Sequence, residues 1–157
     1  MLKSVFNAAM AKFAHEEHVK SAAPVNTDPI VIYQTAGADI FEMDDYLTYA
    51  DPDPVQTNNT ENFIVEGIWH QPGTDMDHVN FSCILMGAPV YDQTFTCSAD
   101  GPDCFTPFGD EEEDWTSTFG FDVPAIAPPF TYHVTVEGRR ADDSAIWTLK
   151  SDFEIPT

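Results

Sequence analysis

Apolar and polar residues alternate along several stretches of the chain, and a period of two is typical of β-strands that are buried on one face. The clearest case lies in the last third of the chain, where Tyr132, Val134 and Val136 share one face and polar residues occupy the other. The pattern predicts strands over residues 30–33, 40–49, 63–69, 79–91, 95–97, 115–123, 131–136 and 144–155, with 79–91 being either a pair of strands or one bent strand.

Residues typical of turns separate these stretches. Proline and glycine punctuate residues 71–74 and 124–129, and an acidic turn covers 141–143. The run Asp51-Pro52-Asp53-Pro54 ends any ladder at that point, because proline has no N–H to donate. About seven or eight strands joined by such turns predict an all-β protein, an immunoglobulin-like β-sandwich of two antiparallel sheets over residues 28–157.

Residues 1–24 differ from the rest and predict an amphipathic helix followed by a linker. Leu2, Phe6, Met10 and Phe13 recur at steps of three and four, which places them on one stripe of a helix. One interpretation is a presequence that is removed, although such helices are rich in arginine and this one carries only lysine. The alternative, which we favour, is a helix that docks its apolar stripe on a partner protein or on its own domain.

The strong excess of acidic residues argues against some classes of binding partner. The chain has 27 acidic and 6 basic residues, for a formal net charge of −21. This balance argues against nucleic-acid binding, since phosphate contacts need clustered lysine and arginine, and it disfavours direct docking to anionic lipid head groups. The acidity fits either solubility at high concentration or a basic protein partner. No apolar run reaches the roughly 18 residues of a membrane-spanning helix, so we expect no transmembrane span.

No arrangement of residues predicts an enzyme. The sequence lacks the nucleotide-binding glycine motifs and the nucleophile motif of hydrolases. His15 and His18 lie about one helical turn apart but have no third ligand nearby, and the cysteine spacing does not match a zinc site. We therefore expect no catalytic residue, no metal and no cofactor.

Five short pieces of the chain, in their order and spacing, resemble the ML lipid-recognition family. That family includes the Niemann–Pick type C soluble sterol carrier, the group 2 mite allergens and fungal phosphatidylglycerol/phosphatidylinositol transfer proteins. The pieces are residues 39–43, 51–54 and 63–67, the pair Cys97 and Cys104, and the segment 123–136 with its Val-Pro and Ala-Pro steps before the alternating strand.

The resemblance implies two splayed sheets around a cavity for a sterol, an acyl chain or a phospholipid. The residues that would line this cavity are the inward apolar ones: Phe63, Val65, Trp69, Phe81, Leu85, Phe95, Phe119, Phe121, Val123, Ile126, Tyr132, Val134, Val136 and Leu149. The same residues would fill the core of an ordinary sandwich, and the sequence leaves both possibilities open.

Cys97 and Cys104 are expected to form a disulfide. They enclose a turn that contains Gly101-Pro102, and members of the family place a short-range disulfide at this point. Such a bond indicates an oxidising compartment: a secretory or extracellular space, an organelle lumen or the intermembrane space. Cys83 lies in an alternating stretch and is expected to be a buried thiol.

Two functions follow from these patterns. The leading hypothesis is a non-enzymatic lipid-binding or lipid-transfer module with one ligand between its sheets. The family's usual disulfide between the first and last strands is missing, because residues 34–35 and 147–148 contain no cysteine. The ends must then be held by packing, by the N-terminal helix or by a partner. This absence favours the alternative, a structural accessory subunit of a larger assembly that docks through its N-terminal helix and acidic surface.

Overall fold

The computed structural model describes residues 29–71, 75–98, 104 and 112–155, and the regular structure within these ranges is all β. The strands are β1 (Ile32–Ala36), β2 (Phe41–Met43), β3 (Tyr49–Asp51), β4 (Asn59–Trp69), β5 (His78–Leu85), β6 (Ala88–Thr96), β7 (Glu113–Val123), β8 (Thr131–Arg139) and β9 (Ala145–Glu154). The predicted helix and linker over residues 1–24 lie outside the described residues.

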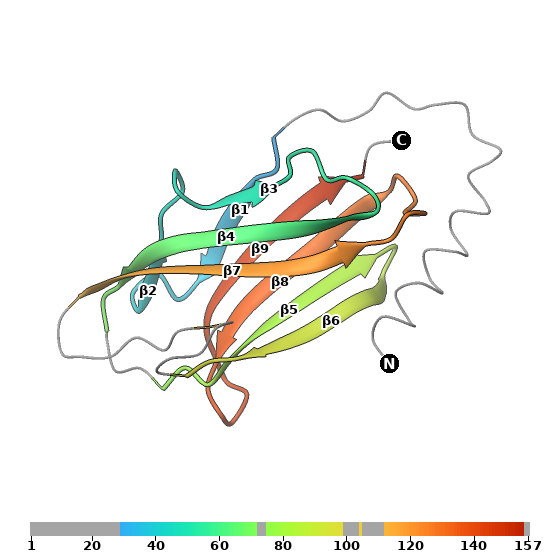
Figure 1. Ribbon diagram of the computed structural model, residues 1–157. Helices are drawn as coiled ribbons and strands as arrows, with labels where there is room; N and C mark the ends of the chain where they lie inside the picture. Colours follow the sequence, from blue (N-terminus) through green and yellow to red (C-terminus); the bar gives the residue numbers. More distant parts are fainter. Residues whose placement is uncertain (1–28, 72–74, 99–103, 105–111, 156–157) are drawn as a thin grey trace.

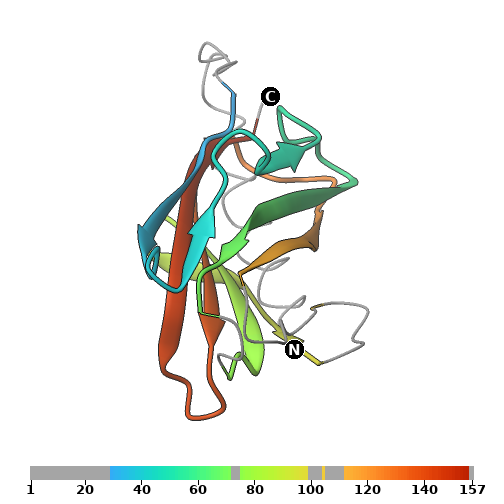
Figure 2. The same cartoon turned by 90° about the vertical axis from the view of Figure 1, so that its left-hand side faces the viewer.

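The strands form two antiparallel sheets that pack face to face (Figures 1 and 2). The larger sheet has the strand order β1-β9-β8-β5-β6. In the smaller sheet, β7 pairs with β4 along its whole length, and β2 and β3 share the opposite edge of β4. The predicted sandwich of two antiparallel sheets is confirmed. No helix in the described part of the chain is long and apolar enough to cross a membrane.

The alternation of the sequence sets which residues face the core. In β4, Phe63, Val65 and Trp69 are buried, and Ile64, Glu66 and Ile68, which point the other way, are more exposed, as the period of two predicts. Tyr132, Val134 and Val136 of β8 are buried in the same way, opposite the polar outer face that carries His133. The prediction for these two strands is confirmed, although β4 begins at Asn59, earlier than expected.

Several predicted strand limits are wrong. The stretch 40–49 is not one strand, because a turn at residues 45–47 separates β2 from β3. For residues 79–91 the first of the two predicted alternatives is confirmed: they form the pair of strands β5 and β6, joined at Met86 and Gly87, both with positive φ. Phe95 belongs to the end of β6 and does not start a strand of its own. β7 begins at Glu113, two residues before the predicted start, and Glu113 pairs with Trp69.

The first and last strands are joined without a disulfide. β1 pairs with β9, with Gln34 opposite Leu149. The Gln34 side chain extends to the other sheet, where its Nε2 donates to the carbonyl oxygen of Phe41 at 2.7 Å and its Oε1 accepts from the Met43 N–H at 3.0 Å. Backbone pairing therefore joins β1 to β9, and the Gln34 amide joins β1 to the smaller sheet.

Candidate functional site

The inner faces of the two sheets are lined almost entirely by large apolar side chains, and aromatic rings meet across the middle. Phe81 of the larger sheet lies 5.4 Å from Phe63 and 5.3 Å from Phe121 of the smaller sheet, measured between ring centroids. Phe95 and Phe119 meet in the same way at 5.3 Å. These distances are those of favourable edge-to-face and tilted ring pairs, so the centre of the sandwich is filled by side chains.

One end of the interior is a cluster of tryptophans around Phe41. The ring of Phe41 lies 5.1 Å from Trp69, 5.3 Å from Trp115 and 5.3 Å from Trp147. The indole of Trp147 lies directly over Gly138 of the neighbouring strand, where any Cβ would collide with its ring. The indole N–H groups of Trp69 and Trp147 are buried without a hydrogen-bond partner among the described residues.

The opposite end of the interior holds a buried carboxyl group. Glu61 lies at the start of β4, opposite Phe121 of β7, on the same face as Phe63. Its side chain is 1% exposed, and neither carboxyl oxygen has a hydrogen-bond partner among the described residues. Glu61 was missed by sequence analysis, although the alternation that places Phe63 and Val65 inward also places this residue inward.

The environment of Glu61 opposes its ionisation. Burial away from water raises the pKa of its carboxyl group, and the nearby charges of Asp51 and Asp53 raise it further, to about 8. Asp51 ends β3 and Asp53 follows in the loop between β3 and β4. Asp53 is itself engaged, because its Oδ2 accepts a hydrogen bond from the Ile30 N–H at 3.0 Å. Glu61 is therefore largely protonated at neutral pH.

A small surface pocket of about 190 Å³ lies at this same end of the sandwich. Its acidic lining residues are Asp53, Asp152 and Glu154, and its apolar lining includes Ile30 and Phe153. Phe153 also faces the interior, where it stacks on Tyr132 and lies 6.4 Å from Phe63. The end of the sandwich that buries Glu61 therefore also carries an acidic hollow, with Phe153 common to the hollow and the interior.

The structure places thirteen of the fourteen predicted lining residues in the buried interior, and Ile126 outside it. Ile126 is 64% exposed on the corner between β7 and β8, because that corner is not a strand and alternation does not fix its direction. Sequence analysis also missed inward aromatic residues, namely Phe41, Trp115, Trp147 and Phe153. Whether the buried residues contact a lipid stays a prediction.

The cysteines behave as predicted. Cys97 and Cys104 form a disulfide, and Cys83 is a buried free thiol, with a pKa that burial raises to about 12. A thiol held in this protonated form is a poor nucleophile.

Among the described residues, no group of three or more His, Cys, Asp or Glu side chains is arranged to hold a metal ion.

Removal of the disulfide is expected to lower the free energy of unfolding by about 2–3 kcal/mol, because the bond closes a short loop and restricts the unfolded chain. The test is urea denaturation of the double variant Cys97→Ser and Cys104→Ser, with and without reductant. Reductant should shift the wild-type midpoint to that of the variant and leave the variant unchanged. A wild-type midpoint that does not respond to complete reduction would contradict the expectation.

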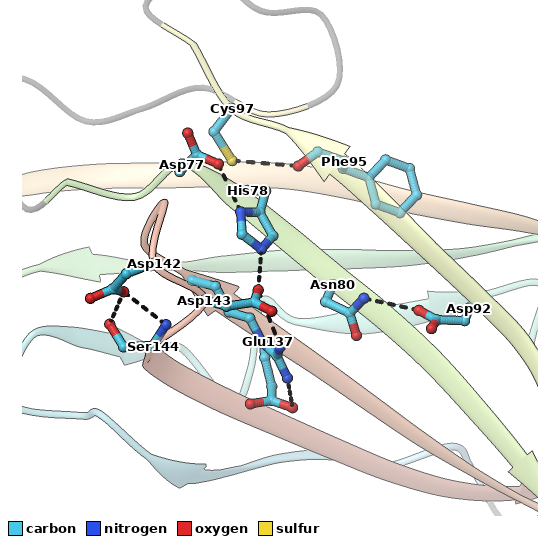
Figure 3. A network of polar contacts seen from close by, with 11 residues as sticks. Asp77, His78, Asn80, Asp92, Phe95, Cys97, Glu137, Asp142, Asp143 and Ser144 are labelled. Atoms are coloured by element: carbon cyan, nitrogen blue, oxygen red, sulfur yellow. Dashed lines mark hydrogen bonds and ion pairs between the residues drawn. The ribbon is translucent and has the colours of Figure 1, made fainter.

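Contacts between His78 and carboxylates connect the strands at the end of the sandwich that holds the tryptophan cluster. The His78 ring lies between two carboxylates, with Nδ1 2.8 Å from Asp77 and Nε2 2.9 Å from Asp143 (Figure 3). Burial lowers the pKa of His78, but the hydrogen bonds of the two carboxylates outweigh it and raise the pKa above its usual value. Arg139 adds contacts to Asp143 at 3.3 Å and to Glu137 at 3.2 Å. Together they tie the β8–β9 turn to the start of β5.

The outer face of the smaller sheet is both acidic and apolar. A hollow of about 260 Å³ on this face is lined by acidic residues that include Glu42, Glu66 and Asp114, together with Leu47 and Ile68. In the neighbouring turn, Tyr46 is 97% exposed. This face offers acidic and apolar groups side by side.

Comparison with known proteins identifies the fold. No family model and no curated relative matches the sequence. The crystal structure of chicken MD-1 complexed with lipid IVa is similar, with a TM-score of 0.51 and 13% sequence identity over 80% of this chain and 88% of that chain. A Niemann-Pick type C2 protein from Japanese carpenter ant aligns with a TM-score of 0.44 and 14% identity over 87% of this chain and 98% of that chain. The predicted ML-type fold is confirmed.

Proposed function

We propose that this chain is a non-enzymatic lipid-binding protein that holds one apolar ligand, a sterol, acyl chain or phospholipid, between its two sheets. The observation that carries the proposal is the apolar interior, which runs from the tryptophan cluster to Glu61 in a fold shared with chicken MD-1, a protein solved in complex with lipid IVa. The residues that would contact the ligand are the buried apolar side chains of β4, β5, β6, β7, β8 and β9.

Burial of the ligand provides the driving force, at about 25 cal/mol for each Å² of apolar surface removed from water. The rings that meet across the centre, such as Phe63 and Phe81, must turn or part to admit the ligand. The work of separating them subtracts from the affinity, so binding is coupled to a small opening of the sandwich.

The end that buries Glu61 is the proposed entrance. The β5–β6 turn and the β7–β8 corner meet here, because Leu85 pairs with Tyr132 at the start of β8. Their exposed apolar residues, Met86 and Ile126, would form the rim. The opposite end is fastened by the disulfide and by the contacts of His78, which favours opening at the Glu61 end.

Tryptophan fluorescence tests the proposal. The three tryptophans of the chain all belong to the buried cluster. A fatty acid brominated near its methyl end should quench this fluorescence in a saturable way, at one ligand per chain, because a bromine that enters the interior from the Glu61 end approaches the indoles. The unbrominated fatty acid is the matched control and should not quench. Absence of saturable quenching by brominated acyl chains and by a brominated sterol would contradict the proposal.

The compartment follows from the disulfide. A disulfide such as Cys97–Cys104 is characteristic of proteins in oxidising compartments, so we place the protein in one of these, without choosing among them.

A second candidate function is favoured by the outer face of the smaller sheet. Its exposed Tyr46 and Leu47, beside Glu42, Glu66 and Asp114, fit a basic amphipathic partner, as in an accessory subunit of an assembly. The double variant Tyr46→Ser and Leu47→Ser should then convert an assembly in native extracts into free monomer. A wild-type protein that sediments as a monomer in the same extract would exclude this function.

A further inference from the structure

A buried carboxyl group without a partner is costly. An unsatisfied buried polar group typically destabilises a fold by about 1–3 kcal/mol, so such groups are rare unless something else satisfies them. Glu61 is fully buried with both oxygens unpartnered among the described residues, and it lies inward between Phe121 and the β3–β4 segment. A ligand in the interior would bring a partner to it.

The surroundings of Glu61 select the charge of that partner. Asp51 and Asp53 lie near Glu61 on one side, and the hollow at the same end adds Asp152 and Glu154. Beside Glu61, β7 presents Phe121. Phe63, two residues further along β4 on the same face, lies 6.4 Å from Phe153, which stacks on Tyr132, and the Tyr132 hydroxyl already donates to the carbonyl oxygen of Pro128. The groups around Glu61 are therefore either acidic or apolar.

Among the described residues, no lysine or arginine lies at this end, and His133 on the outer face of β8 contacts Asp152 at 2.6 Å. The lysine and arginine residues within the described ranges are Arg139, Arg140 and Lys150. The two arginines lie at the turn between β8 and β9, where Arg139 pairs with His78 at the far end of β5. Lys150 is exposed and pairs with Tyr33 and Thr135 on the larger sheet. Within the described part of the chain Glu61 therefore has no cationic partner, and a ligand with a cationic end would supply one.

We propose that Glu61 binds the polar end of the lipid and that this end is a protonated primary amine. This inference rests on the proposed function and adds an orientation to it, with the head group at Glu61 and the chain directed toward the tryptophan cluster. Glu61 and Trp69 lie at opposite ends of β4, about 27 Å apart at the usual rise of a strand, a span suited to a long single chain. Asp51 and Asp53 add attraction for the ammonium group.

The proton balance of binding follows from the same geometry. In the empty protein the carboxyl of Glu61 keeps its proton at pH 7, because its pKa is about 8. When the ammonium group arrives, the carboxyl gives its proton to the solvent and accepts hydrogen bonds from the amine as a carboxylate. Binding at pH 7 should therefore release about one proton per ligand.

The test uses three matched single-chain probes, hexadecylamine, hexadecanol and palmitate, which displace the fluorescent reporter N-phenylnaphthylamine from the full-length chain. Because a charge-assisted hydrogen bond is about twice as strong as a neutral one, hexadecylamine should displace the reporter at a concentration about tenfold lower than hexadecanol. Palmitate should be weaker than both. In the variant Glu61→Gln the advantage of hexadecylamine over hexadecanol should fall to within about twofold.

The variant Asp122→Asn is the matched control, because it removes one negative charge from an exposed position beside Phe121 without touching the interior. It should keep the full preference for the amine. Calorimetry in two buffers should also show release of about one proton on hexadecylamine binding to the wild type and none to Glu61→Gln. Equal preferences in wild type and Glu61→Gln, or palmitate binding as tightly as the amine, would overturn this inference alone. If neither the reporter nor any probe binds, this inference fails, and the proposed function fails with it when the brominated acyl chains and the brominated sterol also do not quench.

Discussion

Phe81→Ala is expected to lower the free energy of unfolding by about 3–5 kcal/mol, because it removes a buried ring at the junction of the two sheets. The Phe81 side chain is buried and packs on Phe63 and Phe121 across the sandwich and on Tyr91 beside it. Truncation to alanine leaves a cavity that the facing rings can only partly fill. Urea denaturation, followed by tryptophan fluorescence, measures the loss.

The matched control for this variant lies on the same strand. Ile84 is a partly exposed residue of β5, so Ile84→Ala should cost less than about 1 kcal/mol. A loss of less than about 1.5 kcal/mol for Phe81→Ala would mean that the sheets are not held together by these rings. The ring contacts described between the two sheets would then be wrong.

Between about pH 5 and pH 8 the wild-type protein is expected to lose about 3–5 kcal/mol of stability relative to the variant Glu61→Gln. Folding raises the pKa of Glu61 from 4.5 to about 8. In this range the folded protein keeps the proton and the unfolded chain does not. Stability from this group is therefore present at low pH and decreases by about 1.4 kcal/mol per pH unit until the folded carboxyl ionises near pH 8.

The difference between the two proteins isolates Glu61 from the other acidic residues, because glutamine does not titrate and the remaining groups are common to both. Urea denaturation at half-unit steps of pH gives the two curves. Asp122→Asn, at an exposed position, should run parallel to the wild type. If the wild-type and Glu61→Gln curves are also parallel from pH 5 to pH 8, Glu61 is not held in a buried site.

The sheets were predictable from the sequence where strands are buried on one face only. In β7 and β8 polar and apolar residues alternate, so strand and inward face both follow from the period, and in β4 the large residues Phe63, Val65 and Trp69 mark the inward face. The limits near turns were less predictable, because the break between β2 and β3 depends on Asp44, whose Oδ1 accepts hydrogen bonds from the Tyr46 and Leu47 N–H groups. Such local capping competes with strand pairing and leaves little trace in hydrophobic periodicity.

The candidate site was only partly predictable. The apolar lining follows from alternation, but Ile126 does not, because a corner has no fixed period. The sequence places Glu61 on the inward face of β4, because it alternates with Phe63 and Val65. Its missing hydrogen-bond partners and its raised pKa depend on tertiary structure, in which Asp51 and Asp53 lie near it. The Gln34 bridge between the sheets likewise depends on tertiary structure, since its partners are backbone groups of β2.

The aromatic rings that fill the centre of the sandwich restrict the route by which a ligand enters. The rings of Phe63, Phe81 and Phe121 form a central contact between the sheets, whereas Glu61 and the acidic hollow lie at one end. A ligand that enters at this end meets the polar group before it displaces the rings. In the proposed path of entry, the polar end of the ligand stays at Glu61, its apolar part displaces the central rings, and the tryptophan end of the sandwich stays closed.

Native mass spectrometry of the protein, purified gently from its source, detects a bound lipid without any added probe. We expect a monomer that carries one additional mass, which denaturing extraction releases as a lipid. A chain that has its bare mass and takes up none of a sterol, a fatty amine, a fatty acid or a phospholipid would contradict this expectation.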